Sequence, residues 1–378
     1  LVKGIPQEFI DRLIAVGGCT GHAEMSVGNC YDAVSTVVDT ELYKVIAFEM
    51  LAEAGVEVLV NTFLAGAIVD NGKIQGVIAE SRSGREAIMA KSFVDSTGYG
   101  DLAAHAGADY VELNDHPVAN SIGVGGLDID TYHNYISGLD IVSQRAEGIR
   151  SGVDGKIVRV DAQWQKMLPE EFLEQANEIG MSFVSTAVHD DGLMFIKLNY
   201  KMETSPTDRD AVAQAEYELR QRQHKAIQLI RKYIPGAEKA YINRTSPSLC
   251  IRRGRTITCD YDITIEDVVE GRHFDDDILA YGFHDCAPRI QVKNGGSYGI
   301  PYRALLPKGI DNLLCAGMMI TSDWEAHMST RNTVSCMGQG QAAGTAAALC
   351  ALKNCTTRQL PYPELRAALE KDDVVFVD

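Results

Sequence analysis

The sequence predicts a doubly wound α/β fold that is interrupted by an inserted α+β domain. Two short apolar strands, in "FVDSTGYGD" (93–101) and "NLLCAGMMI" (312–320), each run into small residues and glycine. A β-meander precedes the first strand, and a long mixed segment separates the two. In a doubly wound sheet the carboxyl ends of the strands line a common ligand crevice, where glycine lets a ligand approach the backbone.

The first part of the chain is typical of a helix, a strand and a meander. Residues 39–55 carry apolar side chains at helical spacing and end at Gly55. The following "VEVLVNTF" (56–63) is apolar enough to predict a buried strand. Three β-type runs come next, separated by two strong hairpin signals, Asn71-Gly72 and Ser83-Gly84.

The middle of the chain is less regular, which favours an inserted domain. A long helix is predicted from about Asp208 to Ile234, where Pro235-Gly236 stops it. Near the end, "IPYRALLPKGIDNLLCAG" (300–317) predicts strand, turn and strand, and an Ala-rich helix begins near Thr333. The expected domains are a cofactor domain in two parts, 1–115 and 300–378, and an inserted substrate domain, 116–299.

Charge and composition exclude several classes of partner. The 378 residues contain 35 Lys plus Arg and 52 Asp plus Glu, a formal net charge of −17. Such a surface repels nucleic acid and anionic membranes. The longest uncharged run, "NTVSCMGQGQAAGTAAALCAL", is rich in Ala, Gly and Gln rather than Leu, Ile and Phe, so it predicts a buried helix and no membrane span. The first residues lack the apolar core of a signal peptide.

The nine cysteines include no Cys-x-x-Cys pair, which argues against a disulfide framework, a zinc ribbon or an iron–sulfur centre. We therefore expect a reducing, cytoplasmic location and no metal. "GRHFDDD" (271–277) reads as a solvated acidic loop rather than a metal site. His284-Asp285-Cys286 matches a nucleophile trio only in its letters, because neighbouring strand positions point to opposite faces.

A helix start with polar residues, 329–333, marks a third candidate stretch for chemistry. The free N–H groups and partial positive charge at a helix N-terminus can stabilise an anion or an electron-rich ring edge. Inside the same helix, Gly338-Gln-Gly340-Gln-Ala-Ala343 matches a dinucleotide fingerprint letter for letter. That fingerprint has meaning only directly after a strand, and here the strand ends near Gly317, so we reject it as a phosphate loop.

Taken together, six segments resemble the FAD-dependent oxidoreductases related to the succinate dehydrogenase and fumarate reductase flavoproteins. They are "GIPQEFIDRL", "LAEAGVEVLVNT", "KSFVDSTGYGDLAAHAGA", "LCIRRGRTI", "GIPYRALLPKGIDNLLCAG" and "STRNTVSCMGQGQAAGTAAAL". The resemblance implies an FAD-binding domain split by a substrate domain, and hydride transfer between FAD and a small organic substrate. Members of that family begin with a strand, Gly-x-Gly-x-x-Gly and a helix, followed by an acidic residue. These 378 residues contain neither, so an upstream segment is expected.

The resemblance also implies cofactor-binding residues. The backbone near Leu64 should touch the adenine, and the residues from Gly317 should lie beside the ribityl chain. The start of the last helix should face the pyrimidine end of the flavin. The full set is Leu64, Thr97, Gly98, Gly100, Asp101, Gly317, Met318, Asn332, Thr333 and Val334.

Four residues are candidates for catalysis: Arg252, Arg255, His327 and Arg331. Arginine can clamp a substrate carboxylate bidentately, and histidine can transfer the proton that accompanies a hydride. Each could equally be structural, as an arginine that bridges domains or a satisfied surface histidine.

Two other functions stay open at this point. A protein without the phosphate loop could be a cofactor-free scaffold or a subunit that keeps the fold. An NAD(P)-dependent reductase is the second alternative, which the misplaced fingerprint disfavours. Beyond a small-molecule substrate, the sequence leaves open a homo-oligomer or an electron-transfer partner.

Overall fold

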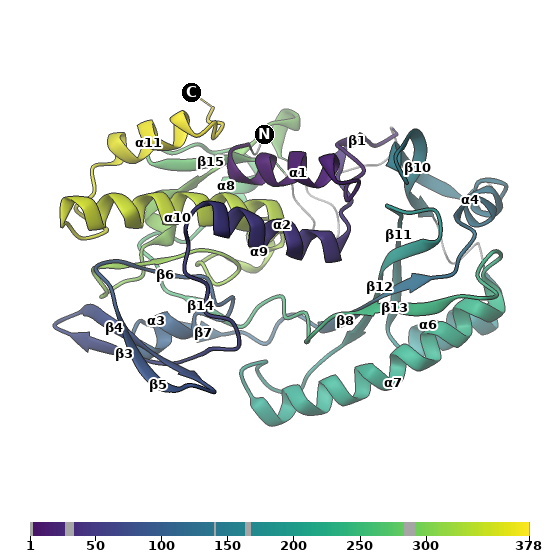
Figure 1. Cartoon of the computed structure of the whole chain (residues 1–378), viewed down its shortest axis with the longest axis horizontal. Coiled ribbons are helices and arrows are strands. Elements are labelled where there is room, and N and C mark those ends of the chain that lie inside the picture. Colours follow the sequence, from purple (N-terminus) through teal and green to yellow (C-terminus); the bar gives the residue numbers. More distant parts are fainter. Residues whose placement is uncertain (1–2, 27–33, 140, 163–167, 283–291, 378) are drawn as a thin grey trace. The chain divides into compact units, whose positions relative to one another are not determined.

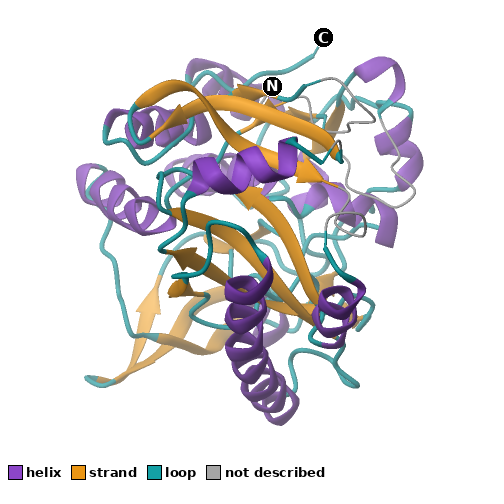
Figure 2. Cartoon of the chain, turned by 90° about the vertical axis from the view of Figure 1, so that its right-hand side faces the viewer, coloured by secondary structure: helices purple, strands orange, loops and turns teal. Residues whose placement is uncertain are grey.

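The computed structural model describes residues 3–26, 34–139, 141–162, 168–282 and 292–377 (Figure 1). The chain forms two compact units. Unit 1 comprises 1–8, 54–115 and 253–378, and unit 2 comprises 9–53 and 116–252. Helices and strands occur throughout (Figure 2), as the mixed α/β prediction requires. The assignment of 1–115, 116–299 and 300–378 to cofactor and substrate domains stays a prediction.

Unit 1 contains the two glycine-terminated strands, and they are neighbours. β6 (Phe93–Asp95) pairs with β17 (Leu313–Cys315) in parallel, with Phe93 opposite Leu313 and Asp95 opposite Cys315. Parallel neighbours end at the same edge of a sheet. The prediction that these two strand ends lie side by side is therefore confirmed.

The predicted meander is also confirmed. β3 (Phe63–Asp70), β4 (Lys73–Ser81) and β5 (Gly84–Met89) form an antiparallel sheet in that order. Asn71 and Gly72 have φ angles of 48° and 73°. Two consecutive positive φ angles are what a tight hairpin turn between twisted strands requires.

Short helices and two-stranded sheets complete unit 1. β7 (Tyr110–Glu112) pairs with β14 (Arg255–Ile257), and β15 (Asp277–Tyr281) pairs with β16 (Tyr298–Pro301). The helices are α3 (Asp101–His105), α8 (Ile265–Val269), α9 (Trp324–Thr330), α10 (Thr333–Lys353) and α11 (Tyr362–Lys371). In α10, Ala342, Ala343 and Ala346 are fully buried, so the small-residue helix packs inside the protein as expected. Within the described ranges, no helix is both long and apolar enough to cross a bilayer.

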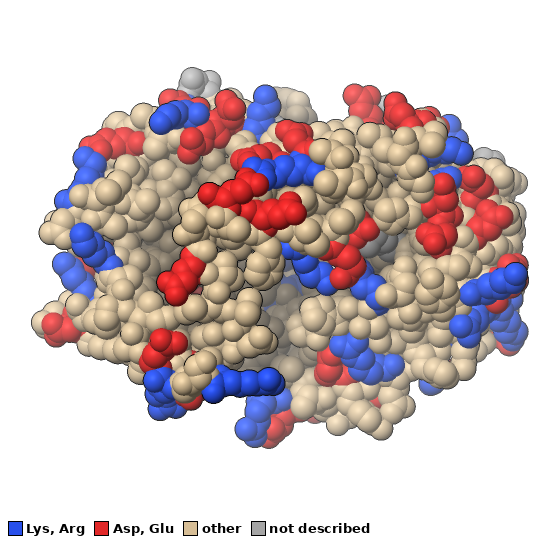
Figure 3. Space-filling model, viewed as in Figure 1, with Lys and Arg blue, Asp and Glu red and all other residues tan. Residues whose placement is uncertain are grey.

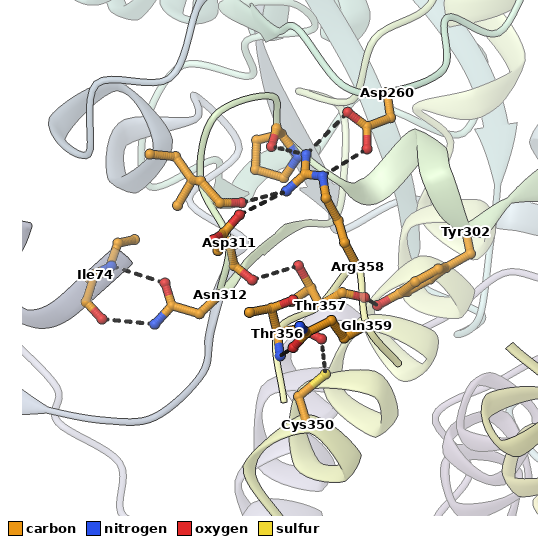
Figure 4. Close-up of polar contacts among 12 residues, drawn as sticks. Ile74, Asp260, Tyr302, Asp311, Asn312, Cys350, Thr356, Thr357, Arg358 and Gln359 are labelled. Carbon is orange, nitrogen blue, oxygen red and sulfur yellow. Dashed lines mark hydrogen bonds and ion pairs between the residues drawn. The ribbon is translucent and has the colours of Figure 1, made fainter. Parts of the chain in front are cut away.

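Polar side chains fix the loop before β17 to the rest of unit 1 (Figure 4). The Asn312 side chain imitates a strand, because it accepts from the Ile74 amide at 2.9 Å and donates to the Ile74 carbonyl at 2.8 Å. Thr357 donates both its amide and its hydroxyl to the Asp311 carbonyl. Arg358 pairs with Asp260 and also donates to the carbonyls of residues 307 and 310. The start of β17 is thereby fixed against the meander and the C-terminal segment.

The predicted buried strand at 56–63 is wrong. Residues 56–62 form no strand, and β3 begins only at Phe63. Val58 is 40% exposed, Val60 58% and Phe63 70%. The apolar pattern therefore lacks a covering element among the described residues, although it has the composition of a buried strand.

Unit 2 is built on a six-stranded antiparallel sheet of order β13-β8-β12-β11-β10-β9. Its strands are β8 (Val118–Gly125), β9 (Val142–Arg150), β10 (Val153–Ala162), β11 (Met181–Thr186), β12 (Gly192–Tyr200) and β13 (Tyr241–Thr245). The other elements are α1 (Ile5–Ala15), which begins in unit 1, β1 (Ala23–Glu24), β2 (Val34–Ser35), α2 (Thr40–Glu53), α4 (Ile129–Ser137) and α6 (Glu170–Glu178).

The predicted long helix is α7 (Arg209–Tyr233), which packs along β8 and β12 (Figure 1). Asp208 caps it by accepting hydrogen bonds from the amides of Asp210 and Ala211. Its buried face repeats at helical spacing, as a helix lying on a sheet requires. The buried apolar positions include Ala215, Leu219, Ala226, Ile227 and Ile230.

A buried arginine joins three elements of unit 2. Arg150, 1% exposed, pairs with Asp130 and Asp190 and donates to the Ile157 carbonyl. Its Nη1 also lies 3.3 Å from His133 Nδ1. Burial, reinforced by the Arg150 charge, lowers the pKa of His133 to about 4. His133 is therefore neutral at pH 7.

This histidine should make the stability of the protein depend on pH. Between about pH 6.5 and 4 the unfolded His133 takes up a proton that the folded protein does not, so stability is lost as pH falls through that window. Across the window the loss should be about 3 kcal/mol larger for the wild type than for His133→Gln, which does not titrate. Urea unfolding at pH 7, 6, 5 and 4 measures it. Equal slopes for the two proteins would contradict the prediction, and His224→Gln, exposed on α7, is the control.

Candidate functional site

The adjacent ends of β6 and β17 form the centre of the candidate site in unit 1. The Ala316 amide donates to the Asp95 carbonyl at 2.9 Å, which continues the pairing to the strand ends. Beyond it, Gly98 and Gly317 have φ angles of 79° and 124°. Only glycine adopts these angles without strain. A Cβ at Gly317 would lie 3.5 Å from Met319 Sδ, its nearest neighbour, so it would be in ordinary van der Waals contact with a flexible side chain there.

Asp95, which the sequence analysis did not single out, shapes the turn after β6. Its side chain is 1% exposed. One carboxylate oxygen accepts from the amide and the hydroxyl of Thr97, and the other accepts from the Ala103 amide at 2.9 Å. The Thr97 hydroxyl in turn accepts from the Asp101 amide. Asp-Ser-Thr after a strand is a local turn signal, so this role was open to prediction.

Two predicted cofactor residues in this turn have close protein contacts. A Cβ at Gly100 would lie 2.5 Å from Ile257 Cδ1, so this glycine makes room for a side chain. Asp101 pairs with Arg255 at 2.7 Å. The Arg255 guanidinium also lies over the Tyr110 ring and 3.5 Å from Glu112. Asp101 and Arg255 therefore fix α3 to the β7–β14 pair, and a direct ligand role for them stays a prediction.

The start of α10 lacks a side-chain cap. Asn332 occupies the N-cap position, but its amide nitrogen donates backward to the carbonyls of Met328 and Ser329 at 2.8 and 3.0 Å. Thr333 and Val334 in the first turn are exposed. The first amides of α10 therefore carry the partial positive charge of a helix N-terminus without a capping oxygen.

Gln339 connects α10 to the end of β17. Its carbonyl oxygen accepts from the Gly317 amide at 2.8 Å, and its nitrogen donates to the Thr330 carbonyl at 3.0 Å and the Ser335 hydroxyl at 3.1 Å. The side chain is fully buried. It also lies inside the rejected fingerprint, and because 338–343 are interior to α10, that rejection is confirmed. The only sequence signal for Gln339 was a large polar residue in a small-residue helix.

The four predicted catalytic residues differ in placement. His327 is 1% exposed in α9, whereas Arg331 is half-buried at the C-cap of that helix and donates to Met328 Sδ at 3.6 Å. Burial raises the pKa of the neighbouring Cys336 thiol to about 11, so it is neutral at pH 7. Arg252 belongs to unit 2, where it donates to Asn199 at 3.4 Å. Of the four, Arg331 is the best placed beside the α10 start.

The structure also places two other predicted cofactor residues, Leu64 and Met318, whose contact with FAD stays a prediction. Leu64 is half-buried on β3, which is an edge strand of the meander, and its residue partner is Ala79. Met318 follows Gly317, and its methyl group is the nearest atom, at 3.2 Å, to a Cβ built on Gly98. The Met318 side chain therefore spans the two strand ends.

The solvated loop predicted at 271–277 is wrong at its last residue, whereas Arg272 and Asp275 are exposed. Asp277 is 4% exposed, and burial raises its pKa to about 6. His273 bonds Asp277 through Nδ1 at 2.9 Å and the Ser297 carbonyl through Nε2 at 3.0 Å. Ser297, His273 and Asp277 thus lie in the sequence of contacts of a serine hydrolase triad. The Ser297 carbonyl, however, is bonded to His273 Nε2, the nitrogen that would have to accept a proton from the serine hydroxyl. His284-Asp285-Cys286 lies outside the described residues.

The basic segment "IRRGRTI" contains a third arginine that the sequence analysis passed over. Arg253 is 3% exposed, donates to the Ser322 carbonyl at 2.6 Å and pairs with Asp115. Burial lowers its pKa, against the attraction of neighbouring carboxylates. Acidic and basic side chains are likewise interspersed over the face in Figure 3. This segment is therefore no free cationic patch.

These features define a flavoprotein of the doubly wound class. The chain belongs to the FAD dependent oxidoreductase family, whose model matches residues 1–369. FAD is accordingly its cofactor, and the protein is an FAD-dependent oxidoreductase. The family match gives no support to a cofactor-free scaffold or an NAD(P)-dependent reductase. No curated protein matches the chain.

Solved structures with a similar fold are distant. A geranylgeranyl bacteriochlorophyll reductase-like protein from Thermoplasma acidophilum has a TM-score of 0.45 and 12% identity, over 98% of this chain and 71% of its own. The anhydrotetracycline hydroxylase OxyS from Streptomyces rimosus has a TM-score of 0.43 and 10% identity, over 96% and 54%. The flavin-dependent brominase Bmp2 has a TM-score of 0.41 and 11% identity, over 98% and 72%.

Replacing Gln339 with Leu should destabilise unit 1 strongly. The substitution conserves approximate volume but leaves the Gly317 amide and the Thr330 carbonyl without their partner in the interior. We expect the free energy of unfolding to fall by about 2 to 4 kcal/mol, because each abandoned buried group costs about 1 to 3 kcal/mol. Urea titration measures it. Gln221→Leu, exposed on α7, is the control, and an equal effect of both substitutions would contradict the proposed role.

Proposed function

We propose that the protein transfers hydride between a small organic substrate and FAD, with the flavin bound in unit 1. The observation that carries the proposal is the meeting of two glycine-ended parallel strands, β6 and β17, with the uncapped start of α10. The Gln339 side chain ties the β17 end to that helix. Gly98 and Gly317 have no side chain of their own, so only the flexible ends of Met318 and Met319 lie beside their Cβ positions. A ligand could approach the backbone by displacing these side chains, and the helix start supplies donors.

The residues present suit the flavin half of FAD. When bound, FAD accepts or gives two electrons at its isoalloxazine ring. The α10 amides at Thr333 and Val334 would stabilise negative charge at the pyrimidine edge, because they have no capping oxygen. Gly317 and Met318 would flank the ribityl chain. Arg331, at the junction of α9 and α10, would bind a substrate anion beside them.

The pyrophosphate half needs a unit that these 378 residues do not contain, since their one fingerprint match is interior to α10. We propose the relation to the succinate dehydrogenase and fumarate reductase flavoproteins, in which a strand, Gly-x-Gly-x-x-Gly and helix supply it. Support comes from 56–63, a strand-like apolar segment whose Val60 and Phe63 are 58% and 70% exposed. Exposed apolar segments of this kind mark surfaces that another element covers.

A reducing, cytoplasmic location is also part of the proposal. The described cysteines, Cys19, Cys250, Cys259, Cys315, Cys336, Cys350 and Cys355, are all free thiols. Free buried thiols persist in a reducing compartment. A homo-oligomer or an electron-transfer partner is compatible with this function, and size-exclusion chromatography with light scattering tests the former.

The protein made from its natural gene, with any upstream residues included, should bind one FAD per chain and lose it on Gly317→Val. The valine side chain would occupy the space where the backbone is proposed to meet the ligand. The φ angle of 124° at this position would also strain any residue other than glycine. Gly84→Val is the matched control, because Gly84 has φ of 112° and open space but lies at a hairpin tip. Absorbance at the flavin band, per folded chain, measures occupancy. Equal FAD content in the two variants would remove β17 from the cofactor site.

Arg331→Met should slow flavin reduction without releasing FAD. The change keeps much of the side-chain length and removes a donor that stabilises developing negative charge, so the barrier should rise by about 2 to 4 kcal/mol. Anaerobic stopped flow, with a substrate found by screening hydroxy acids, unsaturated acids and polyols, measures the rate. Arg85→Met, on the exposed meander, is the control. A wild-type rate would make Arg331 structural, and loss of FAD would make it a cofactor ligand.

A further inference from the structure

Unit 2 contains a pocket that the flavin chemistry of unit 1 does not use. Its volume is about 140 Å³, which is room for several water molecules or one small organic ion. The lining comes from the start of α2, the loop before β12 and the end of β13. The residues that matter are Asp39, Thr40, His189, Asp191, Asn243 and Arg244.

The glycines of "GVGG" (123–126) let the side chains of β13 lie close to β8 beside the pocket. On β8, a Cβ at Gly123 would lie 2.6 Å from Asn243 Oδ1, and one at Gly125 would lie 3.2 Å from Asn243 Nδ2. The facing Gly192 of β12 is likewise bare, with Asn243 Nδ2 3.7 Å from its Cβ position. The glycines of β8, which have the wrong spacing for a phosphate loop, thus make room for the side chain of Asn243 and, at Gly125, for the Tyr241 ring.

Two of the acids at the pocket already have partners. Asp39 accepts from His189 Nε2 at 2.8 Å and from the amides of Glu41 and Leu42. Burial opposes ionisation, but these hydrogen bonds outweigh it and hold the pKa of Asp39 below its usual value. Glu41 pairs with Lys44 at 2.5 Å. Both carboxylates thus have partners within unit 2.

Two other charged side chains at the pocket, Arg244 and Asp191, have no partner of opposite charge among the described residues. Arg244 makes no side-chain hydrogen bond or ion pair to any residue that the structure describes, and its Nε is buried from solvent. The Asp191 carboxylate likewise has no cationic partner among those residues. Thr40 Oγ1 is a further buried polar atom without a hydrogen bond. A buried donor without an acceptor costs about 1 to 3 kcal/mol, which a ligand oxygen would remove.

We propose that this pocket binds a small zwitterion of the α-amino acid type. The Arg244 guanidinium binds the ligand carboxylate, and Asp191 binds its ammonium group. Thr40 and Asn243 supply hydroxyl and amide groups for the remaining hydrogen bonds. The limited volume restricts the ligand to a short side chain. The site lies wholly in unit 2 and does not rest on FAD binding.

The test is calorimetric titration of the full chain with L-serine, compared with L-lactate and ethanolamine, which each keep one of the two charges. Serine should bind saturably and raise the melting temperature, and each single-charge analogue should bind at least tenfold more weakly. Lactate binding as tightly as serine would overturn the zwitterion assignment. No saturable binding of serine, glycine or alanine would overturn the site.

Variants assign the two charges. Arg244→Met should abolish serine binding, and Asp191→Asn should weaken it at least tenfold, whereas Arg209→Met, 91% exposed on α7, should bind as the wild type does. Wild-type affinity in either pocket variant would overturn the assignment. Because Asp191 is exposed, Asp191→Asn should fold, and it therefore tests the ligand assignment even where Arg244→Met fails to fold. FAD content should stay unchanged in all three, which separates failure here from failure of the flavin proposal.

Discussion

The Gln339 amide is the interaction on which the geometry of unit 1 depends. One planar group holds the Gly317 amide at the end of β17, the Thr330 carbonyl at the end of α9 and the Ser335 hydroxyl in α10. Each of these would otherwise be a buried polar group without a partner. Because the oxygen and the nitrogen of the amide are both used, the strand end and the helix start cannot move independently. A cofactor bound between them meets a preorganised backbone.

Preorganisation extends to β6 through Asp95. Its carboxylate binds Thr97 and the Ala103 amide in the way that Gln339 binds Gly317 and Thr330. Two buried polar side chains thus fix the turns after two parallel strands, and neither needs to face the ligand. If the flavin binds at these turns as proposed, substitution of such a residue would change the site by displacing backbone, although the residue itself does not touch the cofactor.

The sequence predicted features that local chemistry determines. Asn71-Gly72 requires a tight turn, Asp208 and Pro235 delimit α7, and the two strands that end in small residues and glycine are parallel neighbours. The sequence could not predict the role of Gln339, because its hydrogen bond to the Gly317 amide joins residues 22 positions apart and depends on how the side chain is oriented. Gly100 was assigned to the cofactor, yet Ile257 fills its space, since a missing Cβ looks the same whichever atom approaches.

The error at 56–63 has a different cause. An apolar pattern indicates that a segment is suited to a buried position, but it does not indicate which other element would cover it. Val60 and Phe63 carry the pattern of a buried strand and are exposed because nothing in the described chain covers them. The apolar composition of 56–63 therefore describes what would pack against this segment, and it does not by itself make the segment a strand.

The two proposed ligand sites would recognise their ligands by different means, and this affects how much of each site a sequence can reveal. Unit 1 offers backbone amides and glycines, which leave a readable signature of small residues after strands. Unit 2 offers side-chain charges, and most of its arginines are matched by carboxylates, as Arg150 is by Asp130 and Asp190. Against that background a guanidinium such as Arg244, with no partner in the described chain, stands out only once the contacts are known. Glycines at 123, 125 and 192 matter in unit 2 for the space they leave, whereas in unit 1 Gly98 and Gly317 matter for their φ angles as well.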